Sequence, residues 1–527
     1  MNQYIQLAAF ALQRLESEGF EAFLVGGCVR EALRAELGQS TSLPEVPDAG
    51  QNPGQESALD SSLPATDIDI TTNALPEEIC RVFSDLAVIE TGIKHGTVTV
   101  LVPACPASAD PPEGNPACAA DAAAADSFAV APGGVSDPTE KLPRRPIEIT
   151  TYRVDGAYSD GRHPDQVRFV TSLKEDLRRR DFTVNALAMN LRGELADPFG
   201  GRADLEAGTI RAVGDAEARF REDGLRILRA LRFAAVLDYE IEPQTEAALK
   251  RCAPLLEEIS AERIFAELKK LVCGGAAGRV VRRYADVLAV IIPQMAPMKG
   301  FRQNNPYHKY DVLEHCVRAM EAVRPERAPG EDAAPGYCMK LAALLHDIGK
   351  PGTYSVDENG IGHFYGHPQE GAVIVRQVMK RLKADRFTSE RMETLVRYHD
   401  LVFQEDDRLL KRWMNRYSPQ VLLEILEIKR ADNIATGNVS QELLDKFDRI
   451  EQRIRSIRRE AAGGRDCFAI RDLAVNGRDL MEAGFPEGPE IGRILQTLLE
   501  EVIDGQLPNE RQALLDRAAD CSFPPAE

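Results

Sequence analysis

The chain has 527 residues, a formal net charge of −19, 44% hydrophobic residues and 28% charged residues, which is typical of a soluble globular protein. No run approaches the roughly 20 apolar residues that span a membrane, and the acidic charge argues against indiscriminate nucleic-acid binding. The ten cysteines show no paired CxxC spacing, so we expect reduced thiols in a cytoplasmic protein. The amphipathic N-terminus lacks the basic start of a signal peptide.

Strands and helices alternate in the first part of the chain. We expect strands at 22–25, 66–72, 96–102 and 146–154, and helices at 28–37, 76–84 and 173–189. Residues 38–65 and 103–144, rich in Pro, Gly, Ser, Ala and acids, show no periodicity and are expected to be surface insertions. From about residue 205 onward the pattern is almost entirely helical.

Residues 220–240 are expected to form one helix with two distinct faces. Leu225, Leu228 and Leu231 recur at helical spacing on the apolar side. A basic stripe on another side of the helix consists of Arg226, Arg229 and Arg232, with Asp223 one turn before it. Seen alone, this stripe fits a solvated face with an ion pair and Asp223 as the N-cap, and only the rest of the chain favours a functional role.

Two carboxylates alternate with isoleucines in "TDIDIT". In a strand, Asp67 and Asp69 share one face, and paired carboxylates suit a hard cation such as Mg²⁺. Upstream, Gly26 and Gly27 form a strand-to-helix turn with Arg30 one turn into the helix, an arrangement that suits a bound phosphate. Together, on successive strands, these features predict the metal and triphosphate site of a nucleotidyltransferase.

Seven motifs occur in order: "GGCVREAL", "DIDITTNALPEEI", "HGTVTV", "YRVDGAYSDGRHPDQVRF", "RRDFTVNALAM", "DPFGGRADL" and "REDGLRILRALRFAA". This series resembles the class II tRNA nucleotidyltransferases, the CCA-adding enzymes of the polymerase-β superfamily. One departure is Glu31, where the family pattern has Asp. The segment from "LAVNGRDLMEAGF" onward resembles the tail of bacterial members.

The resemblance implies a fold class: an α+β head of polymerase-β nucleotidyltransferase type, with a small mixed sheet plus helices, followed by an all-α neck, HD domain and tail. The expected boundaries are 1–195 for the head, 196–300 for a nucleotide-selecting and tRNA-binding neck, 301–436 for the HD domain and 437–527 for a tRNA-binding tail. The implied reaction is addition of C, C and A to the 3′ end of tRNA from CTP and ATP.

The resemblance also implies residue roles in the head. Gly27, Arg30 and Arg180 contact the incoming nucleotide, and Asp67 and Asp69 hold Mg²⁺. The strand position of Glu148, opposite in direction to Ile147 and Ile149, makes it a candidate third carboxylate, with an exposed strand residue as the alternative. Residues 159–166 resemble the flexible loop linked to the switch from C to A.

The resemblance places Asp223, Arg226, Arg229 and Arg232 at the nucleotide pocket, and base chemistry supports this. Cytosine and adenine present an amino donor beside a ring-nitrogen acceptor, whereas uracil and guanine present the opposite pattern. An Asp acceptor near an Arg donor therefore complements C and A without a nucleic-acid template. Arg229 and Arg232 suit the base edge, the triphosphate or an orienting ion pair.

The helical half carries a second series of metal-binding residue types. "LAALLHDIGKP" and an upstream His resemble the HD metal-dependent phosphohydrolases, whose ligands hold a divalent transition metal. The expected ligands are His315, His346, Asp347 and Asp432, with His367 and His399 serving a second metal, the substrate phosphate or structure alone. His308 is expected at the surface or behind the ligands. A phosphohydrolase acting on 2′,3′-cyclic phosphate or damaged RNA 3′ ends would fit.

Other activities share parts of this pattern. An A-adding tRNA nucleotidyltransferase or a poly(A) polymerase has the same head, although "ETGIKHGTVTV" stands where the polymerase carries a basic-aromatic element. A protein-modifying uridylyltransferase also joins a nucleotidyltransferase head to an HD domain, but this chain leaves no room for its sensing domains. A non-catalytic RNA-binding protein would not need Asp67 and Asp69.

Overall fold

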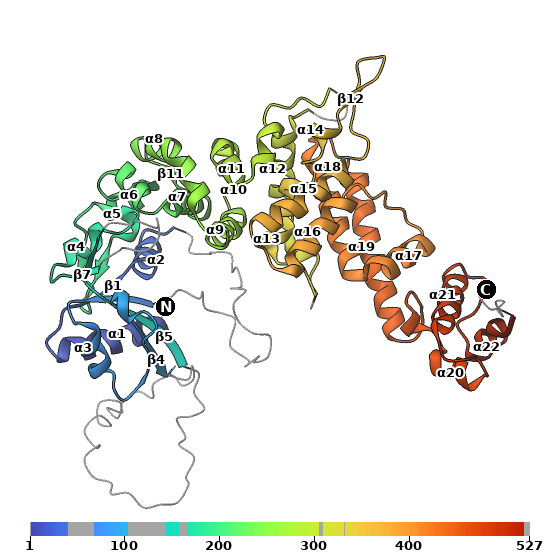
Figure 1. Cartoon of the computed structure of the whole chain (residues 1–527), viewed down its shortest axis with the longest axis horizontal. Coiled ribbons are helices and arrows are strands. Elements are labelled where there is room, and N and C mark those ends of the chain that lie inside the picture. Colours follow the sequence, from blue (N-terminus) through green and yellow to red (C-terminus); the bar gives the residue numbers. More distant parts are fainter. Residues whose placement is uncertain are drawn as a thin grey trace, which may run out of the picture. The chain divides into compact units, whose positions relative to one another are not determined.

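The computed structural model describes residues 2–39, 68–103, 144–156, 167–304, 309–330 and 332–520. Both expected insertions lie almost wholly outside these residues, as does the loop at 159–166, so these expectations stay predictions. Contacts divide the chain into two units, Met1–Ala230 with Tyr239–Leu255 and Leu231–Asp238 with Leu256–Glu527 (Figure 1). No helix among the described residues is long and apolar enough to cross a membrane. The expected four-part domain division stays a prediction.

A mixed seven-stranded sheet forms the centre of the first unit. Its strands, in spatial order, are β3 (Ala87–Ile89), β4 (Thr97–Pro103), β5 (Arg144–Thr151), β2 (Ile68–Thr72), β1 (Ala22–Val25), β8 (Ala188–Met189) and β9 (Leu195–Ala196). Within this sheet, as far as its residues are described, only β2 and β5 pair in parallel. The four strands expected from the sequence are β1, β2, β4 and β5, and the short β3, β8 and β9 were not predicted.

One face of this sheet packs against two helices, and alternate residues of its strands are buried there. In β4, Val98, Val100 and Val102 are buried while the residues between them are half-buried. They join a core with Leu12 and Leu15 of α1 (Asn2–Ser17) and with residues of α3 (Pro76–Val82). Burying each such aliphatic side chain contributes roughly 1.5–3 kcal/mol. The opposite face of β2 and β5 is left for polar side chains.

The prediction of one long helix at 173–189 is wrong. Helix α4 ends at Arg178 (Leu173–Arg178), and Phe182 is extended, with φ −127° and ψ 151°, before a 3₁₀ turn at Thr183–Asn185 and strand β8. Phe182 forms an isolated antiparallel bridge with Ala212. Residues 181–188 are buried, so tertiary packing on all sides overrides the local helical preference.

The single helix expected at 220–240 is also wrong, because it breaks at Asp223 and Gly224. Helix α6 (Ala216–Glu222) ends there, α7 (Leu225–Leu237) begins, and strand β11 (Glu240–Ile241) follows. Asp223 is extended, with φ −147° and ψ 105°, and its Oδ1 accepts the Leu225 N–H at 3.0 Å. The Asp therefore starts the second helix in the manner of an N-cap.

The remaining elements of this region are short. They are α2 (Gly27–Glu36), β6 (Arg153–Asp155), β7 (Val167–Phe169), α5 (Gly201–Glu206), β10 (Thr209–Ile210) and α8 (Pro243–Cys252). Strands β10 and β11 pair in parallel.

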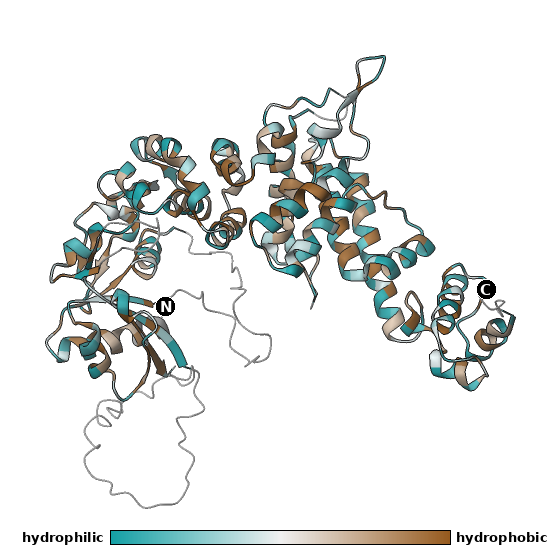
Figure 2. Ribbon diagram, viewed as in Figure 1, coloured by the Kyte–Doolittle hydropathy of each residue, from teal (hydrophilic) through white to brown (hydrophobic). Residues whose placement is uncertain are grey.

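The second unit is almost all helix. Its helices are α9 (Ala261–Cys273), α10 (Ala277–Arg283), α11 (Ala285–Ile291), α12 (Val312–Ala322), α13 (Gly336–Leu345), α14 (Lys350–Thr353), α15 (His367–Arg381), α16 (Arg386–Tyr398), α17 (Asp407–Tyr417), α18 (Pro419–Ala435), α19 (Gln441–Ala462), α20 (Gly477–Glu482), α21 (Pro489–Ile503) and α22 (Arg511–Asp520). Helices α12, α13, α15, α16 and α18 pack as a bundle with hydrophobic residues gathered at its centre (Figure 2).

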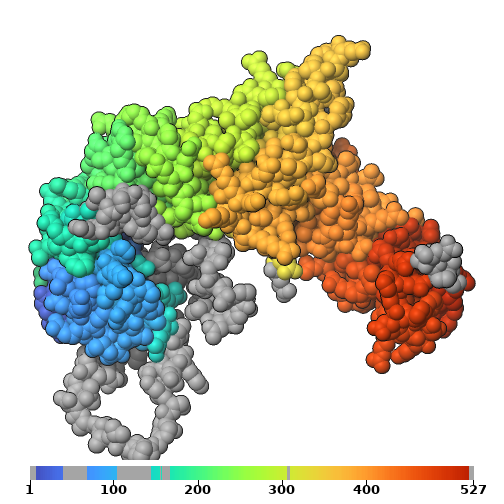
Figure 3. Space-filling view, in the orientation of Figure 1, coloured from blue at the N-terminus to red at the C-terminus, as the bar shows by residue number. Residues whose placement is uncertain are grey.

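After residue 205, where the pattern predicts almost only helix, the described strands are short: the hairpin of β12 (Ser355–Val356) and β13 (Gly362–His363), and the parallel pair of β10 and β11. This hairpin segment projects from the bundle (Figures 1 and 3). A separate core of Leu480, Ile494, Leu498 and Leu514 holds α20, α21 and α22 together.

Candidate active and metal sites

Asp69 and Glu148 are direct partners across the parallel strands β2 and β5. Their neighbours Ile70 and Ile149 are buried in the core, so the alternation turns both carboxylates to the other face of the sheet. Asp67 lies outside the described residues. The structure therefore brings two of the three expected carboxylates to one side of one ladder.

The turn between β1 and α2 approaches Asp69 closely. Gly26 has φ +73°, and a Cβ there would lie 3.4 Å from Asp69 Oδ2 and 3.5 Å from the Arg180 guanidinium. A side chain at this position would be strained and would crowd both groups. Gly27 is the first residue of α2, so the amino end of this helix, an acidic strand residue and an arginine meet as expected.

Arg30 is buried in a charged network one turn into α2. Its Nε donates to Glu31 Oε1 at 2.9 Å, and Nη1 makes a short hydrogen bond to Asn185 Oδ1. Glu31 also accepts from Arg34 Nη1 at 2.9 Å. The carboxylate that departs from the family pattern thus holds two arginines in place.

Each arginine of the stripe on α7 meets a different carboxylate. Arg226 Nη1 lies 2.7 Å from Glu222 Oε2, and its guanidinium also donates to the backbone carbonyls of Arg219 and Arg179 at 3.2 and 3.0 Å. Arg229 Nη2 lies 2.6 Å from Asp181 Oδ2. Arg232 Nε lies 3.1 Å from Glu267 Oε2. The stripe is therefore not a solvated face: each of its guanidinium groups is paired with a different carboxylate.

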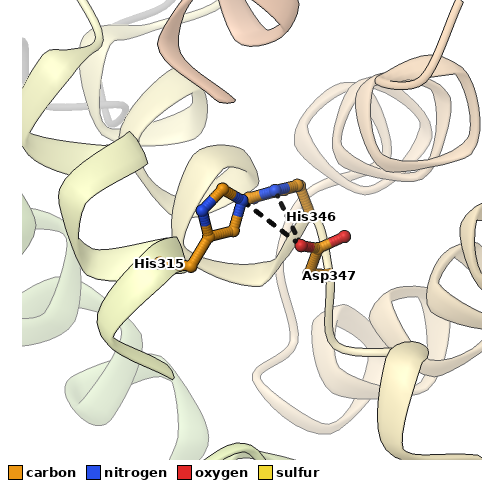
Figure 4. A group of neighbouring side chains, drawn as sticks. All are labelled: His315, His346 and Asp347. Atoms are coloured by element: carbon orange, nitrogen blue, oxygen red, sulfur yellow. Dashed lines mark ion pairs between the residues drawn. The ribbon is translucent and has the colours of Figure 1, made fainter. Parts of the chain in front are cut away.

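Six metal-binding side chains from the helical bundle converge in the second unit. His315 lies on α12, and His346 and Asp347 directly follow α13 (Figure 4). Asp432 lies on α18. The other two are His367 at the start of α15 and His399 at the end of α16. All the expected ligands are brought together, whereas His308 lies outside the described residues.

The two oxygens of Asp347 face two different groups of nitrogens. Oδ2 lies 3.4 Å from His315 Nε2 and 3.2 Å from His346 Nε2, while Oδ1 lies 3.2 Å from His367 Nε2 and 3.5 Å from His399 Nε2. Each trio has its ligand atoms within 4.8 Å of one another. Asp432 Oδ1 joins the first trio, 3.0 Å from His315 Nε2. The geometry can hold two cations that share Asp347.

Charges around this cluster shift the pKa values of two of its members in opposite directions. Burial opposes the ionised form of Asp347, but His346 and Lys350 outweigh it and hold the carboxyl pKa well below its ordinary range. Burial likewise lowers the pKa of His346, but Asp347 raises it well above its ordinary value. Lys350 Nζ lies 2.6 Å from Asp347 Oδ2. Among the described residues, however, His346 Nε2 and Asp347 Oδ2 are buried without a hydrogen bond of good geometry, as expected of ligand atoms.

A cavity of about 950 Å³ opens onto this cluster. Asp347, His367, His399 and Asp432 form part of its lining, so these four candidate ligands are accessible to a substrate. Burial lowers the pKa of His399, which favours the neutral imidazole that binds metals. The cavity volume suits a small organic ligand.

Comparisons with known proteins extend over nearly the whole chain. The CCA-adding enzyme of Streptococcus sanguinis is 31% identical over 510 residues, which are 97% of this chain and 96% of that protein. The CCA-adding enzyme of Latilactobacillus sakei is 31% identical over 508 residues, 96% of each chain. This chain belongs to the CCA-adding enzymes. It is therefore a nucleotidyltransferase, as the ordered motifs predicted.

Three family models match successive segments of this CCA-adding enzyme, and a solved structure matches nearly its whole length. Residues 134–211 match a poly A polymerase head domain, 238–299 a probable RNA and SrmB-binding site of polymerase A, and 370–518 a putative domain 2 of tRNA nucleotidyltransferase. The crystal structure of Bacillus stearothermophilus CCA-adding enzyme in complex with CTP aligns with a TM-score of 0.62 and 26% identity. It covers 99% of this chain and 98% of that chain. The expected fold class is confirmed.

Two aspartates of this CCA-adding enzyme were missed by the sequence analysis. Asp176 is fully buried, accepts from the Thr71 hydroxyl at 3.1 Å and from Arg179 Nε at 2.9 Å, and lies 3.5 Å from Arg180 Nη2. Its spacing before Arg179 and Arg180 in "EDLRRRD" is an i+3 and i+4 signal that could have found it.

Asp181 is the second missed aspartate. It accepts from Asn185 Nδ2 at 3.1 Å and from Arg229 Nε at 2.7 Å. Burial alone would raise its pKa, but Arg229 and the hydrogen bond from Asn185 hold that pKa well below its ordinary range. Its pairing across 48 residues with Arg229 has no local sequence signal.

Proposed function

We propose that this CCA-adding enzyme adds C, C and A to the 3′ end of tRNA, using CTP and ATP. The observation that carries the proposal is that Asp69 is the register partner of Glu148 and lies beside the Gly26 turn, which Arg180 also approaches. The names of its relatives support this reaction, and the relative from Bacillus stearothermophilus binds CTP.

Asp69 and Glu148, with Asp67, would hold Mg²⁺ in the head. Two carboxylates on one face of a ladder repel each other without a cation, so the donor set fits a hard divalent ion. When bound, Mg²⁺ neutralises the α-phosphate and lowers the pKa of the attacking 3′-hydroxyl. The amino end of α2 and the Arg180 guanidinium bind and orient the triphosphate.

Asp223 and Arg226 select the base in this proposal. Arg226 is 9% exposed and is anchored by Glu222 and two backbone carbonyls, so its guanidinium is preorganised. Asp223 lies in the break before α7, where its Oδ1 accepts the Leu225 N–H. A carboxylate acceptor and a guanidinium donor complement cytosine and adenine, and a wrong base leaves buried polar groups unsatisfied. Arg229 and Arg232 position the helix through Asp181 and Glu267.

Extension of tRNA lacking its CCA end tests the proposal directly. With CTP alone we expect addition of two nucleotides, and with ATP alone none. ATP is expected to extend only a tRNA that already ends in CC. An enzyme that extends a CC end with ATP but adds nothing from CTP would instead be the A-adding alternative, and one that adds A to any tRNA end would be the poly(A) polymerase-like alternative. Modification of a protein by UTP would be the uridylyltransferase alternative.

We propose a second activity, a metal-dependent phosphohydrolase, for the bundle. The buried His346 and Asp347 ligand atoms without good hydrogen bonds support it. His315, His346, Asp347 and Asp432 would hold one divalent transition metal, and His367 and His399 would complete a second position with Asp347. A bound metal polarises the phosphate and activates water. Lys350, 2.6 Å from Asp347, orients that carboxylate.

The phosphohydrolase is tested with His346→Ala and with His95→Ala, a control on the head. Wild type and control are expected to hydrolyse a nucleoside 2′,3′-cyclic phosphate with Mn²⁺, Ni²⁺, Co²⁺ or Mg²⁺, and His346→Ala is expected to lose this activity and to bind the metal more weakly by calorimetry. CCA addition is expected to survive in His346→Ala. A wild type inactive with all four metals contradicts the second activity.

A further inference from the structure

Tyr365 presents a large aromatic ring to solvent beside the ligand cluster. The residue is 78% exposed, an unusual state for an aromatic side chain of this size. Its ring stacks on His363 with the ring centroids 5.2 Å apart and an interplanar angle of 8°. One face of the tyrosine is thus supported by a parallel ring, and the stacked pair forms a flat aromatic platform.

Neighbouring contacts fix the orientation of this platform. His363 Nε2 lies 3.0 Å from Asp357 Oδ2, and His363 Nδ1 lies 3.4 Å from the Tyr365 hydroxyl. His363 also pairs with Ser355 in the β12–β13 hairpin. Because both ring nitrogens and the backbone are engaged, the platform is organised before any ligand arrives.

The platform lines the same cavity as the candidate metal ligands. His363 and Tyr365 share this lining with Asp347, His367 and Asp432. Tyr365 precedes His367 by two residues, and His367 Nε2 is 3.2 Å from Asp347 Oδ1. A flat group on the tyrosine therefore lies in the same cavity as the candidate metal ligands.

The remaining lining residues suit a sugar and a base edge. Asn433, Asn438 and Ser440 line the cavity and offer neutral hydrogen-bond donors and acceptors. A volume of about 950 Å³ accommodates a nucleotide, not only a phosphate group. Aromatic faces bind any nucleobase by stacking, with little dependence on its sequence identity.

We propose that Tyr365, stacked on His363, is a base-binding subsite that makes the cavity selective for nucleotide substrates. The proposal rests on the phosphohydrolase proposed above, whose substrate class it specifies. The base stacks on Tyr365 and places the ribose phosphate at the Asp347 cluster. The base can belong to a free nucleotide or to the 3′ end of an RNA strand, since both carry the same chemistry.

Fluorescence of 2-aminopurine, which falls on stacking, tests the subsite without hydrolysis. The probes are 2-aminopurine riboside 3′-monophosphate and a trinucleotide that ends in 2-aminopurine, each titrated with the full chain. Wild type and Tyr365→Phe are expected to quench at least one probe with similar Kd, and Tyr365→Ala is expected to raise that Kd by about 10- to 100-fold. The control is Phe387→Ala, which removes a 43% exposed ring that does not line the cavity and is expected to bind as wild type. Equal binding by Tyr365→Ala overturns the proposal.

The two probes and a hydrolysis assay separate the remaining outcomes. Quenching of the trinucleotide alone identifies an RNA end as the source of the base, and quenching of both probes shows that a mononucleotide suffices. In hydrolysis, Tyr365→Ala is expected to raise KM for adenosine 2′,3′-cyclic phosphate but not for ribose 2′,3′-cyclic phosphate, which lacks a base. Equal losses on both substrates contradict base binding. A wild type that hydrolyses neither substrate overturns the phosphohydrolase, while the quenching result still decides the subsite.

Discussion

Asp69 and Glu148 lie side by side on one face of the sheet, as register partners in the parallel ladder of β2 and β5. The residues on either side of each carboxylate are buried isoleucines. The register leaves neither carboxylate able to turn into the core. A close approach by Gly26 places the backbone turn of β1 and α2 beside Asp69. This relationship supports the proposed binding of a metal-bound triphosphate at the head.

Asp69→Asn is predicted to lower the rate of nucleotide addition by about 10²- to 10³-fold, the scale of losing one transition-state-stabilising group. Glu148→Gln is predicted to cause a similar loss if this residue is the third carboxylate. Rates on tRNA lacking its CCA end measure both, with Glu90→Gln on the same domain as a control for charge removal. A Glu148→Gln variant with the control's rate would assign Glu148 to the strand surface instead.

Asp223→Asn is predicted to relax base selection without unfolding the neck. An amide can still cap α7 through the Leu225 N–H, but it offers a donor as well as an acceptor to the base. Incorporation of UTP relative to CTP is expected to rise by about 10- to 100-fold. Single-nucleotide incorporation with all four triphosphates measures this ratio. A variant that still accepts only C and A, with an unchanged ratio, removes the base-reading role from Asp223.

Asp181→Asn is predicted to destabilise the protein by roughly 3 kcal/mol, because it leaves Arg229 without its buried carboxylate. Since the folded pKa of Asp181 lies below its unfolded value, this stabilisation is present above about pH 4 and is lost as the pH falls further. Denaturant unfolding at pH 7 and pH 3.5 measures the change. The control Glu217→Gln, which breaks exposed ion pairs with Arg221 and Arg251, is expected to leave the free energy of unfolding almost unchanged, because solvent screens such pairs. Equal effects of the two substitutions would rule out a special role for Asp181.

Glu427→Gln is predicted to stabilise the bundle at alkaline pH. Burial raises the pKa of Glu427 to about 7, although the Arg324 N–H and Arg327 oppose this rise. Because the unfolded carboxyl ionises near pH 4.3, the folded state binds more protons between these values, and the free energy of unfolding falls as the pH rises. The glutamine keeps the acceptor for the Arg324 N–H and removes the cost of ionisation.

The free energies of unfolding of Glu427→Gln and wild type are expected to be similar near pH 4 and to differ by roughly 2–4 kcal/mol above pH 7, with the variant more stable. Denaturant titrations at a series of pH values measure this difference in the free energy of unfolding. Other titrating groups contribute equally to both proteins, so their contributions cancel in the difference. A constant difference across this range would show that Glu427 titrates normally.

Local patterning predicted the sheet better than it predicted the turns. Strands β2, β4 and β5 are visible because their buried Ile and Val residues alternate with polar ones. The break at Asp223 is invisible to such a pattern, because the apolar spacing of α7 continues backwards through Phe220. The prediction for the segment after α4 was wrong for a different reason. Its residues are buried on every side, so its sequence gives no contrast between a buried and an exposed helical face.

Residue chemistry predicted the histidines and aspartates that gather in the bundle, but it missed Asp176 and Asp181 in the head and did not predict how the side chains are held. The histidines and aspartates of the bundle are rare enough in an apolar helical context to be noticed, and the structure gathers them around Asp347. The partners of the arginine stripe could not be assigned, because Asp181 and Glu267 come from distant segments. The sequence also gave no reason to connect Tyr365 with His363, whose stacking depends on the β12–β13 hairpin.

The most direct test of the account is to sequence the 3′ ends of tRNA lacking CCA after incubation with this protein, Mg²⁺ and all four nucleoside triphosphates. The account predicts that wild type adds CCA and stops, and that Asp69→Asn adds almost nothing. Products that end in A alone, in a run of A, or in U or G would contradict it.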